Sequence, residues 1–219
     1  MSEELDLTFP TSITNMALAH AATALGKMIK EEVIVHDFTV NPPDWEWEVA
    51  EGEFFVLRTD VKGDFAGEVY LVVVPEDEPK ISDILLPGSL VGQPEMREAI
   101  LLEVDNILTA SVVTKYSEVL KKQVIGDVPE AQRYSAASLS EYFTNKASSE
   151  SYVFNFSSQL ITFQTELKLY FGGFFNQRFV EDVLEATKPE YHQREADNGE
   201  SGSYISKTTK GLFRKILPW

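Results

Sequence analysis

Three residues in the second half of the chain, Glu103, Asn106 and Pro129, have types and spacing that could serve chemistry at a surface. Each residue of a helix advances about 100°, so positions 103 and 106 lie about 60° apart and one turn along. An apolar stripe through Val104 and Leu108 marks the far side of this helix, so the carboxylate and the carboxamide point away from the core. The pair offers charge and hydrogen bonds to a docking partner. The alternative is the solvated polar face that any surface helix has.

The helix that must carry this pair is predicted roughly from Pro94 to Gln123, and a similar helical pattern runs roughly from 12 to 31. Proline at position 94 suits the first turn of a helix. Ala99 and Ala110 flank the pair on its own face. These small neighbours leave both polar groups accessible to a closely packed partner.

The two halves of the chain repeat one order of patterns. Aligning Asn15 with Asn106 places Val33-Ile34 on Val124-Ile125, at the end of each long helix. Each half then predicts two strands and a short helix, and the second half adds an extra helix or ordered loop. The predicted strands are 53–61, 66–74, 151–156 and 160–171, the short helices contain 81–85 and 180–184, and the extra segment is 134–149. We therefore predict a pseudo-twofold α+β fold, whose antiparallel sheet carries two long helices side by side on one face. Chance similarity between amphipathic helices is the alternative.

A change in composition near residue 188 predicts where the folded domain ends. We predict one domain over residues 1–187, with repeats at about 8–90 and 91–187, and then a linker and a basic amphipathic tail over 188–219. The last part of the tail, KTTKGLFRKILPW, is basic in a very acidic protein. Three interpretations remain open. The tail packs on its own acidic body, it is a docking peptide that raises the local concentration of a partner, or it touches a membrane.

Composition argues against several kinds of site. The absence of cysteine excludes thiol catalysis, disulfides and cysteine-ligated zinc. The three histidines lie far apart and lack metal-ligand spacing, so we expect no metal or cofactor bound by this chain. A net charge of −16 argues against nucleic acid as a partner. Because the acidic N-terminus has no apolar signal core and no stretch could span a bilayer, we expect a soluble cytoplasmic protein.

The second long helix resembles the signature of the chemotaxis phosphatases of the CheC, CheX and FliY type. That signature reads Asp/Ser-x3-Glu-x2-Asn-x22-Pro, give or take a residue before the proline. Glu103, Asn106 and Pro129 match it at the expected spacing, whereas Ala99 stands where Asp or Ser is usual. The likeness covers roughly residues 8 to 187, because the duplicated order of elements also resembles CheC.

The resemblance implies a phosphatase that hydrolyses the aspartyl phosphate of a CheY-type response regulator. It implies that Asn106 orients the attacking water, that Glu103 pairs with the regulator's active-site lysine, and that Pro129 supports the motif. It also implies that Mg²⁺ is supplied by the regulator. Phosphoryl transfer depends on positioning and electrostatics, and a carboxamide can hold a water without being a base. A CheD-type deamidase is a further candidate partner.

The first repeat is expected to hold a degenerate second site. Asn15 is present, but Ser12 replaces the glutamate and Phe38 sits where the proline would fall. A serine cannot form the long ion pair to a lysine, so we expect one competent site, in the second half. Asn15 as a helix-start residue is the alternative.

A non-enzymatic function is the main rival. The middle domain of the flagellar switch protein FliM has a similar fold without this catalytic pair, so the fold alone does not prove activity. The rival is a binding module for a response regulator or another chemotaxis or flagellar-switch protein. Ala99 favours this rival, and the pair of Glu103 and Asn106 favours the phosphatase.

Overall fold

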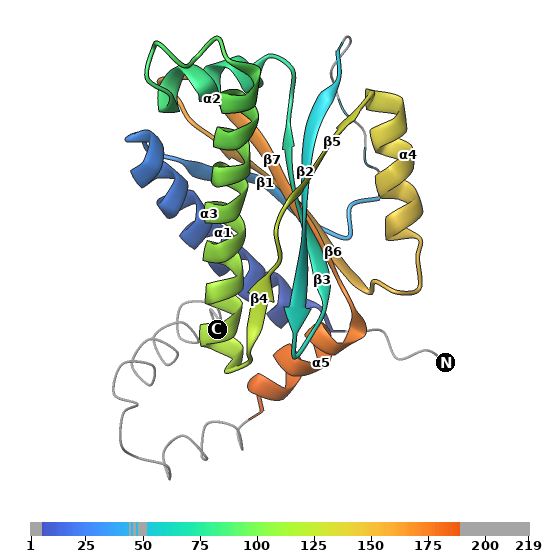
Figure 1. The fold of residues 1–219 in the computed structure, drawn as a ribbon. Helices are drawn as coiled ribbons and strands as arrows, with labels where there is room; N and C mark the ends of the chain where they lie inside the picture. The colour runs from blue at the N-terminus through green and yellow to red at the C-terminus, as the bar shows by residue number, and fades with distance from the viewer. Residues whose placement is uncertain (1–5, 44, 46, 48–51, 189–219) are drawn as a thin grey trace, which may run out of the picture.

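The chain forms an antiparallel sheet with its two long helices on one face, as Figure 1 shows. The structure is a computed structural model that describes residues 6–43, 45, 47 and 52–188. In chain order the elements are α1 (Thr8–Ile29), β1 (Ile34–Val40), β2 (Phe54–Gly63), β3 (Gly67–Val73), α2 (Asp77–Leu85), α3 (Pro94–Leu120), β4 (Val124–Gly126), β5 (Glu130–Tyr134), α4 (Ala136–Ala147), β6 (Phe154–Ile161), β7 (Lys168–Phe175) and α5 (Gln177–Ala186). The predicted α+β class is confirmed.

The strands of the two halves interleave in one sheet. The order is β1-β6-β7-β3-β2-β4, with β5 also paired to β2, and every pair is antiparallel. The first strand after each long helix therefore pairs with a strand of the other half, and β3 and β7 meet in the centre. This order is symmetric when the halves are exchanged. A duplication would give such an order, and the duplication itself stays a prediction.

Apolar side chains fill a layer on each face of the sheet. The larger core lies under α1, α2, α3 and α5, and it includes Leu18, Leu108 and Phe179. A second, aromatic core lies between the sheet and α4, which covers the opposite face in Figure 1. Strand β2 alternates between the two cores, with Phe54 in the aromatic core and Phe55 in the larger one. Burial on both faces explains why this segment reads as a continuous apolar run.

The two long helices lie side by side, as predicted. The hydroxyl groups of Thr14 on α1 and Tyr116 on α3 are hydrogen bonded at 3.0 Å, and His20 Nδ1 lies 3.2 Å from the carbonyl oxygen of Ser111. Each helix ends at a lysine in the left-handed conformation, with φ of 60° at Lys30 and 55° at Lys121. A residue in this conformation is a common helix stop.

Several predicted boundaries differ from the structure. Helix α1 begins at Thr8 rather than near position 12, because Pro10 lies in the first turn, where a missing N–H is tolerated. The strands predicted at 151–156 and 160–171 are wrong in their limits. Their hairpin turns at 162–167, where Thr162 N donates to Leu167 O at 3.0 Å. The predicted short helices and the extra helix are observed as α2, α5 and α4.

Three strands have no counterpart in the sequence-based prediction, namely β1, β4 and β5. Strands β1 and β4 lie at the ends of the sheet order, and β4 and β5 are only three and five residues long. The predicted tail lies outside the described residues beyond Lys188. Among the helices that the structure describes, none is long and apolar enough to cross a membrane.

Candidate functional site

Helix α3 turns the predicted pair toward solvent. Pro94 occupies its first turn, and the side chains of Leu101, Val104 and Leu108 are completely buried against the sheet. Glu103 and Asn106 fall between these positions and are both exposed. Their exposure agrees with the helical spacing, because the stripe that α3 buries fixes the direction of every other residue on it. Their chemical roles stay a prediction.

The surface around the pair is open and made of small side chains. Ala99, Ala110 and Thr114 are exposed on the same helix face as Glu103 and Asn106. Within the described part of the chain, the side chains of Glu103 and Asn106 take part in no hydrogen bond or ion pair. The carboxylate and the carboxamide therefore keep their full bonding capacity for a molecule that docks on this face.

A buried carboxyl group lies directly inside the site. Asp105 is completely buried, and its Oδ2 accepts a hydrogen bond of 2.6 Å from the hydroxyl of Thr59 on β2. Its Oδ1 and the Thr109 hydroxyl have no partner among the described residues. Burial raises the pKa of Asp105 to about 7, which the Thr59 hydrogen bond only partly offsets. Sequence spacing places Asp105 off the exposed face, but nothing in the sequence pairs it with Thr59, 46 residues away.

Strand β4 lies against α3 at the level of this buried group. A Cβ atom added to Gly126 would lie 2.9 Å from Thr109 Cγ2 and 3.4 Å from Thr59 Cγ2, so only glycine allows this approach. Pro129 follows β4 and is buried. It therefore does not contribute to the exposed surface that Glu103 and Asn106 form, and its supporting role stays a prediction.

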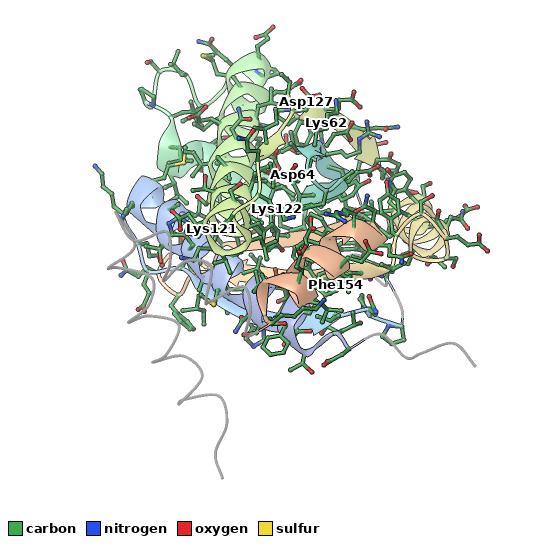
Figure 2. The ribbon with its side chains drawn as sticks, turned by 90° about the horizontal axis from the view of Figure 1, so that it is seen from below. Lys62, Asp64, Lys121, Lys122, Asp127 and Phe154 are labelled. Atoms are coloured by element: carbon green, nitrogen blue, oxygen red, sulfur yellow. The ribbon has the colours of Figure 1, made fainter. Side chains whose placement is uncertain are left out.

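Polar contacts fix this edge of the sheet and the end of α3. Lys62 of β2 forms an ion pair with Asp127, and the two side chains meet in Figure 2. Asp127 N also donates to the carbonyl oxygen of Asp60 at 2.8 Å. Just past the end of α3, where Figure 2 labels Lys121 and Lys122, Lys122 Nζ lies 3.0 Å from the carboxylate of buried Asp182 on α5. These contacts therefore fix the chain around β4 to β2, and the residues just after α3 to α5.

The corresponding face of α1 differs from that of α3. Asn15 is exposed and Ser12 is partly buried, while Phe38 lies on β1 and packs against Phe156 with ring centroids 6.2 Å apart. The alternative role of Asn15 as a helix-start residue is wrong, because α1 begins seven residues earlier at Thr8. Among the described residues, no group of three or more His, Cys, Asp or Glu side chains could hold a metal ion.

Comparison with known proteins finds similarity only at the level of structure. No family model and no curated protein sequence matches the chain. FliY from Thermotoga maritima has 18% identity and a TM-score of 0.60, over 85% of this chain and 96% of that one. The CheX–CheY–BeF3–Mg²⁺ complex from Borrelia burgdorferi contains a chain with 13% identity and a TM-score of 0.50, over 80% of this chain and all of that one. The FliM middle domain from H. pylori has 12% identity and a TM-score of 0.51, over 84% of this chain and 99% of that one. The chain therefore has the CheC-like fold that FliY, CheX and the FliM middle domain share.

Proposed function

We propose that this protein hydrolyses the aspartyl phosphate of a CheY-type response regulator in chemotaxis or a related two-component signalling system. The observation that carries the proposal is the exposed pair of Glu103 and Asn106 on α3, whose side chains have no hydrogen-bond or ion-pair partner among the residues that the structure describes. The fold supports it, because one solved structure of this fold is a CheX–CheY complex with BeF3 and Mg²⁺. BeF3 is a stand-in for a phosphoryl group, so that complex resembles a regulator carrying its phosphate.

In the proposed reaction, water attacks phosphorus, the bond from phosphorus to the aspartyl oxygen breaks, and inorganic phosphate leaves the regenerated carboxylate. The Asn106 carboxamide holds the water in line through hydrogen bonds to its oxygen and nitrogen. Glu103, one turn away, forms an ion pair with a lysine of the regulator and fixes the docked orientation. Such positioning is a large part of catalysis in phosphoryl transfer, which needs little covalent help from the protein.

The regulator supplies the remaining groups in this proposal. Its aspartate carries the phosphoryl group, and its Mg²⁺ neutralises charge on the oxygens during transfer. A regulator of this kind is cytoplasmic, so we propose the same compartment for this chain. A CheD-type deamidase remains a further candidate partner, which a binding measurement with the purified deamidase would test.

A phosphate-release assay tests the proposal. The protein is mixed with response regulators phosphorylated in vitro in the presence of Mg²⁺, and loss of phosphate from each regulator is followed. The Asn106→Ala and Glu103→Ala variants are assayed in parallel. Asn15→Ala is the matched control, because it makes the same change at an exposed position on α1. The proposal fails if the wild type accelerates no regulator or if Asn106→Ala is as active as the wild type.

The second candidate function is a binding module without catalysis. It is favoured by the similarity to the FliM middle domain and by Ala99, which breaks the phosphatase signature four residues before Glu103. The same samples discriminate the two functions. A regulator that binds with an affinity dependent on Glu103, but loses phosphate no faster than alone, identifies the binding module.

A further inference from the structure

Helix α3 carries exposed negative charge beside the proposed site. Glu95, Glu98 and Glu103 are all exposed, and their side chains form no hydrogen bond or ion pair with any residue that the structure describes. Arg97 is the only basic residue within residues 94–110. The half of α3 that holds the proposed site is therefore a surface that favours a positively charged partner.

Large apolar side chains are exposed next to this acidic surface. Among the described residues three such side chains are exposed, those of Ile125, Val128 and Phe163. Ile125 lies in β4 and Val128 follows this strand, and they are 68% and 78% exposed. Exposed apolar groups that gather on a soluble protein often mark an interaction surface. A partner for this region would combine positive charge with apolar side chains.

Strand β4 leads from the end of α3 back toward the proposed site. Ser117 Oγ donates to the carbonyl oxygen of Val124 at 3.4 Å. Gly126 lies against Thr109, which comes two turns earlier on α3 than Ser117. The chain after Gly126 therefore continues along the flank of α3, where Figure 1 shows β4 beside the helix. We call the combined region the α3–β4 surface, formed by Glu95, Glu98, Glu103, Asn106, Ile125 and Val128.

The sequence of this chain contains a segment with the complementary properties. Residues 207–219, the basic tail, combine positive charge with large apolar side chains and contain no acidic residue. The basic residues are Lys207, Lys210, Arg214 and Lys215, and the large apolar residues are Leu212, Phe213, Ile216, Leu217 and Trp219. The basic tail therefore matches the α3–β4 surface in both charge and hydrophobicity.

The length of chain before the basic tail matches the distance to this surface. The described residues end at Lys188, just after α5, and Asp182 of α5 lies 3.0 Å from Lys122 at the end of α3. From there to Asn106 the distance along the helix is about 24 Å, at 1.5 Å per residue. A flexible chain as long as residues 189–206 has a root-mean-square length of about 23 Å. Such a match between linker length and span gives the highest local concentration.

We propose that the basic tail docks on the α3–β4 surface of its own chain and covers Glu103 and Asn106. Its basic side chains pair with the glutamates of α3, and its apolar side chains lie on Ile125 and Val128. A tail in this place excludes a regulator from the same helix face, so the protein is autoinhibited until a regulator displaces the tail. The competition with a regulator rests on the proposed function, whereas the docking itself does not.

Paramagnetic NMR on the full-length, ¹⁵N-labelled protein tests the docking. The chain has no cysteine, so Thr209→Cys allows a nitroxide to be attached at one position only. At about 0.01 M salt the backbone amide signals of Asn106 and Val128 should lose most of their intensity. The signal of Glu141 should keep its intensity, because α4 covers the opposite face of the sheet. The losses should shrink at about 0.15 M salt, where charges are screened over a shorter distance.

Variants of the folded domain locate the contact. Glu95→Lys reverses one charge of the α3–β4 surface, and Val128→Ser removes one of its apolar groups. Each variant should restore at least half of the Asn106 signal that the nitroxide removes. Glu141→Lys and Phe163→Ser make the same changes at exposed positions elsewhere, and they should restore none of it.

The docking is overturned if the Asn106 and Val128 signals keep their intensity, or if the matched control variants restore the Asn106 signal equally well. A mixture of nitroxide-labelled protein without ¹⁵N and ¹⁵N-labelled protein without nitroxide detects contacts between molecules. Equal signal losses in this mixture would overturn docking within one chain.

A titration with a phosphorylated regulator tests the competition. Replacing the four basic residues of the tail with glutamine keeps the chain length and should abolish the signal losses. This variant should also bind the regulator severalfold more tightly than the wild type does. Equal affinity would overturn the competition. Because binding is measured directly, this result does not depend on catalysis. Absence of phosphate release from the wild type and from this variant would instead contradict the phosphatase function alone.

Discussion

Glu103 and Asn106 share one helix face, but the proposed mechanism gives their removal different kinetic effects. Asn106 acts on the attacking water, so Asn106→Ala should lower kcat by about 10²-fold with little change in KM. Glu103 acts on docking, so Glu103→Ala should raise KM by about tenfold and leave kcat close to the wild-type value. Steady-state phosphate release over a range of regulator concentrations measures both constants. Equal losses of kcat in the two variants would contradict the separate roles.

Asp105 makes the stability of the protein depend on pH. Burial raises the pKa of Asp105 to about 7 from 3.8, so the folded state favours the protonated carboxyl. The contribution of the protonated Asp105 carboxyl to the free energy of unfolding is fully present below pH 3.8. This contribution is lost as pH rises through 7, at up to about 1.4 kcal/mol per pH unit. Asp105→Asn stays neutral and can still accept from Thr59. Its advantage in free energy of unfolding over the wild type should therefore grow from about pH 5.5 to about pH 8.

Urea unfolding at both pH values measures this advantage. Asp83→Asn, at an exposed position on α2, is the matched control for the loss of one carboxylate. An advantage of Asp105→Asn that is the same at both pH values would show that Asp105 is not the titrating group.

The sequence predicts which way some side chains point, but not which distant residues they contact. The direction of Glu103 and Asn106 follows from helical spacing, because an amphipathic helix buries one stripe whatever its partner is. The surroundings of Asp105 do not follow, since they depend on a contact with Thr59 in a strand of the other half. Trp45 and Asn155, which lie more than 100 residues apart in the sequence and line one hollow, are also brought together only by the fold.

At the scale of elements, the contact between β4 and α3 is tight enough to test. Gly126→Ala places a Cβ 2.9 Å from Thr109 Cγ2, and a β-branched side chain has little freedom to move away. We expect a loss of about 1–3 kcal/mol in the free energy of unfolding. Thr109→Ser removes this methyl group, so the double variant Gly126→Ala with Thr109→Ser should recover part of the loss. A double-mutant cycle by urea unfolding measures the coupling, and additive effects would contradict a direct contact.

Long elements were predictable and short edge elements were not. Helices α1 and α3 carry several turns of apolar periodicity, which outweighs local exceptions such as Pro10. Strands β4 and β5 are mostly exposed and lack an alternating pattern, so only their pairing with β2 defines them. The same dependence on pairing explains why the sequence pattern predicts one strand over 160–171, although residues 162–167 form a turn.

The whole molecule depends on pairings between its halves. Strand β1 pairs with β6, and β4 and β5 pair with β2, so neither half could form the observed sheet alone. The repeated order of patterns predicts which elements exist and that a sheet lies under two helices. It does not predict the interleaved strand order, because partners in a sheet are chosen by long-range packing rather than by local sequence.

The charge distribution of the whole chain leads to a last prediction, about the basic tail. Residues 207–219 contain four basic and no acidic residues, so the other 206 residues carry a net charge of −20. From this asymmetry we predict that the tail packs on the acidic body of its own chain. Deleting residues 205–219 should then lower Tm by about 2–4 °C at low salt, the effect of roughly 1 kcal/mol in a protein of this size.

The difference in Tm should shrink as salt rises, because the screening length falls from about 30 Å at 0.01 M to about 8 Å at 0.15 M. Thermal unfolding of both forms across this range provides the measurement. A full-length variant with Lys210→Gln and Arg214→Gln keeps the chain length and should reproduce part of the loss. An unchanged Tm together with weaker binding of the regulator would instead identify the tail as a docking peptide, which acts by raising the local concentration of its partner.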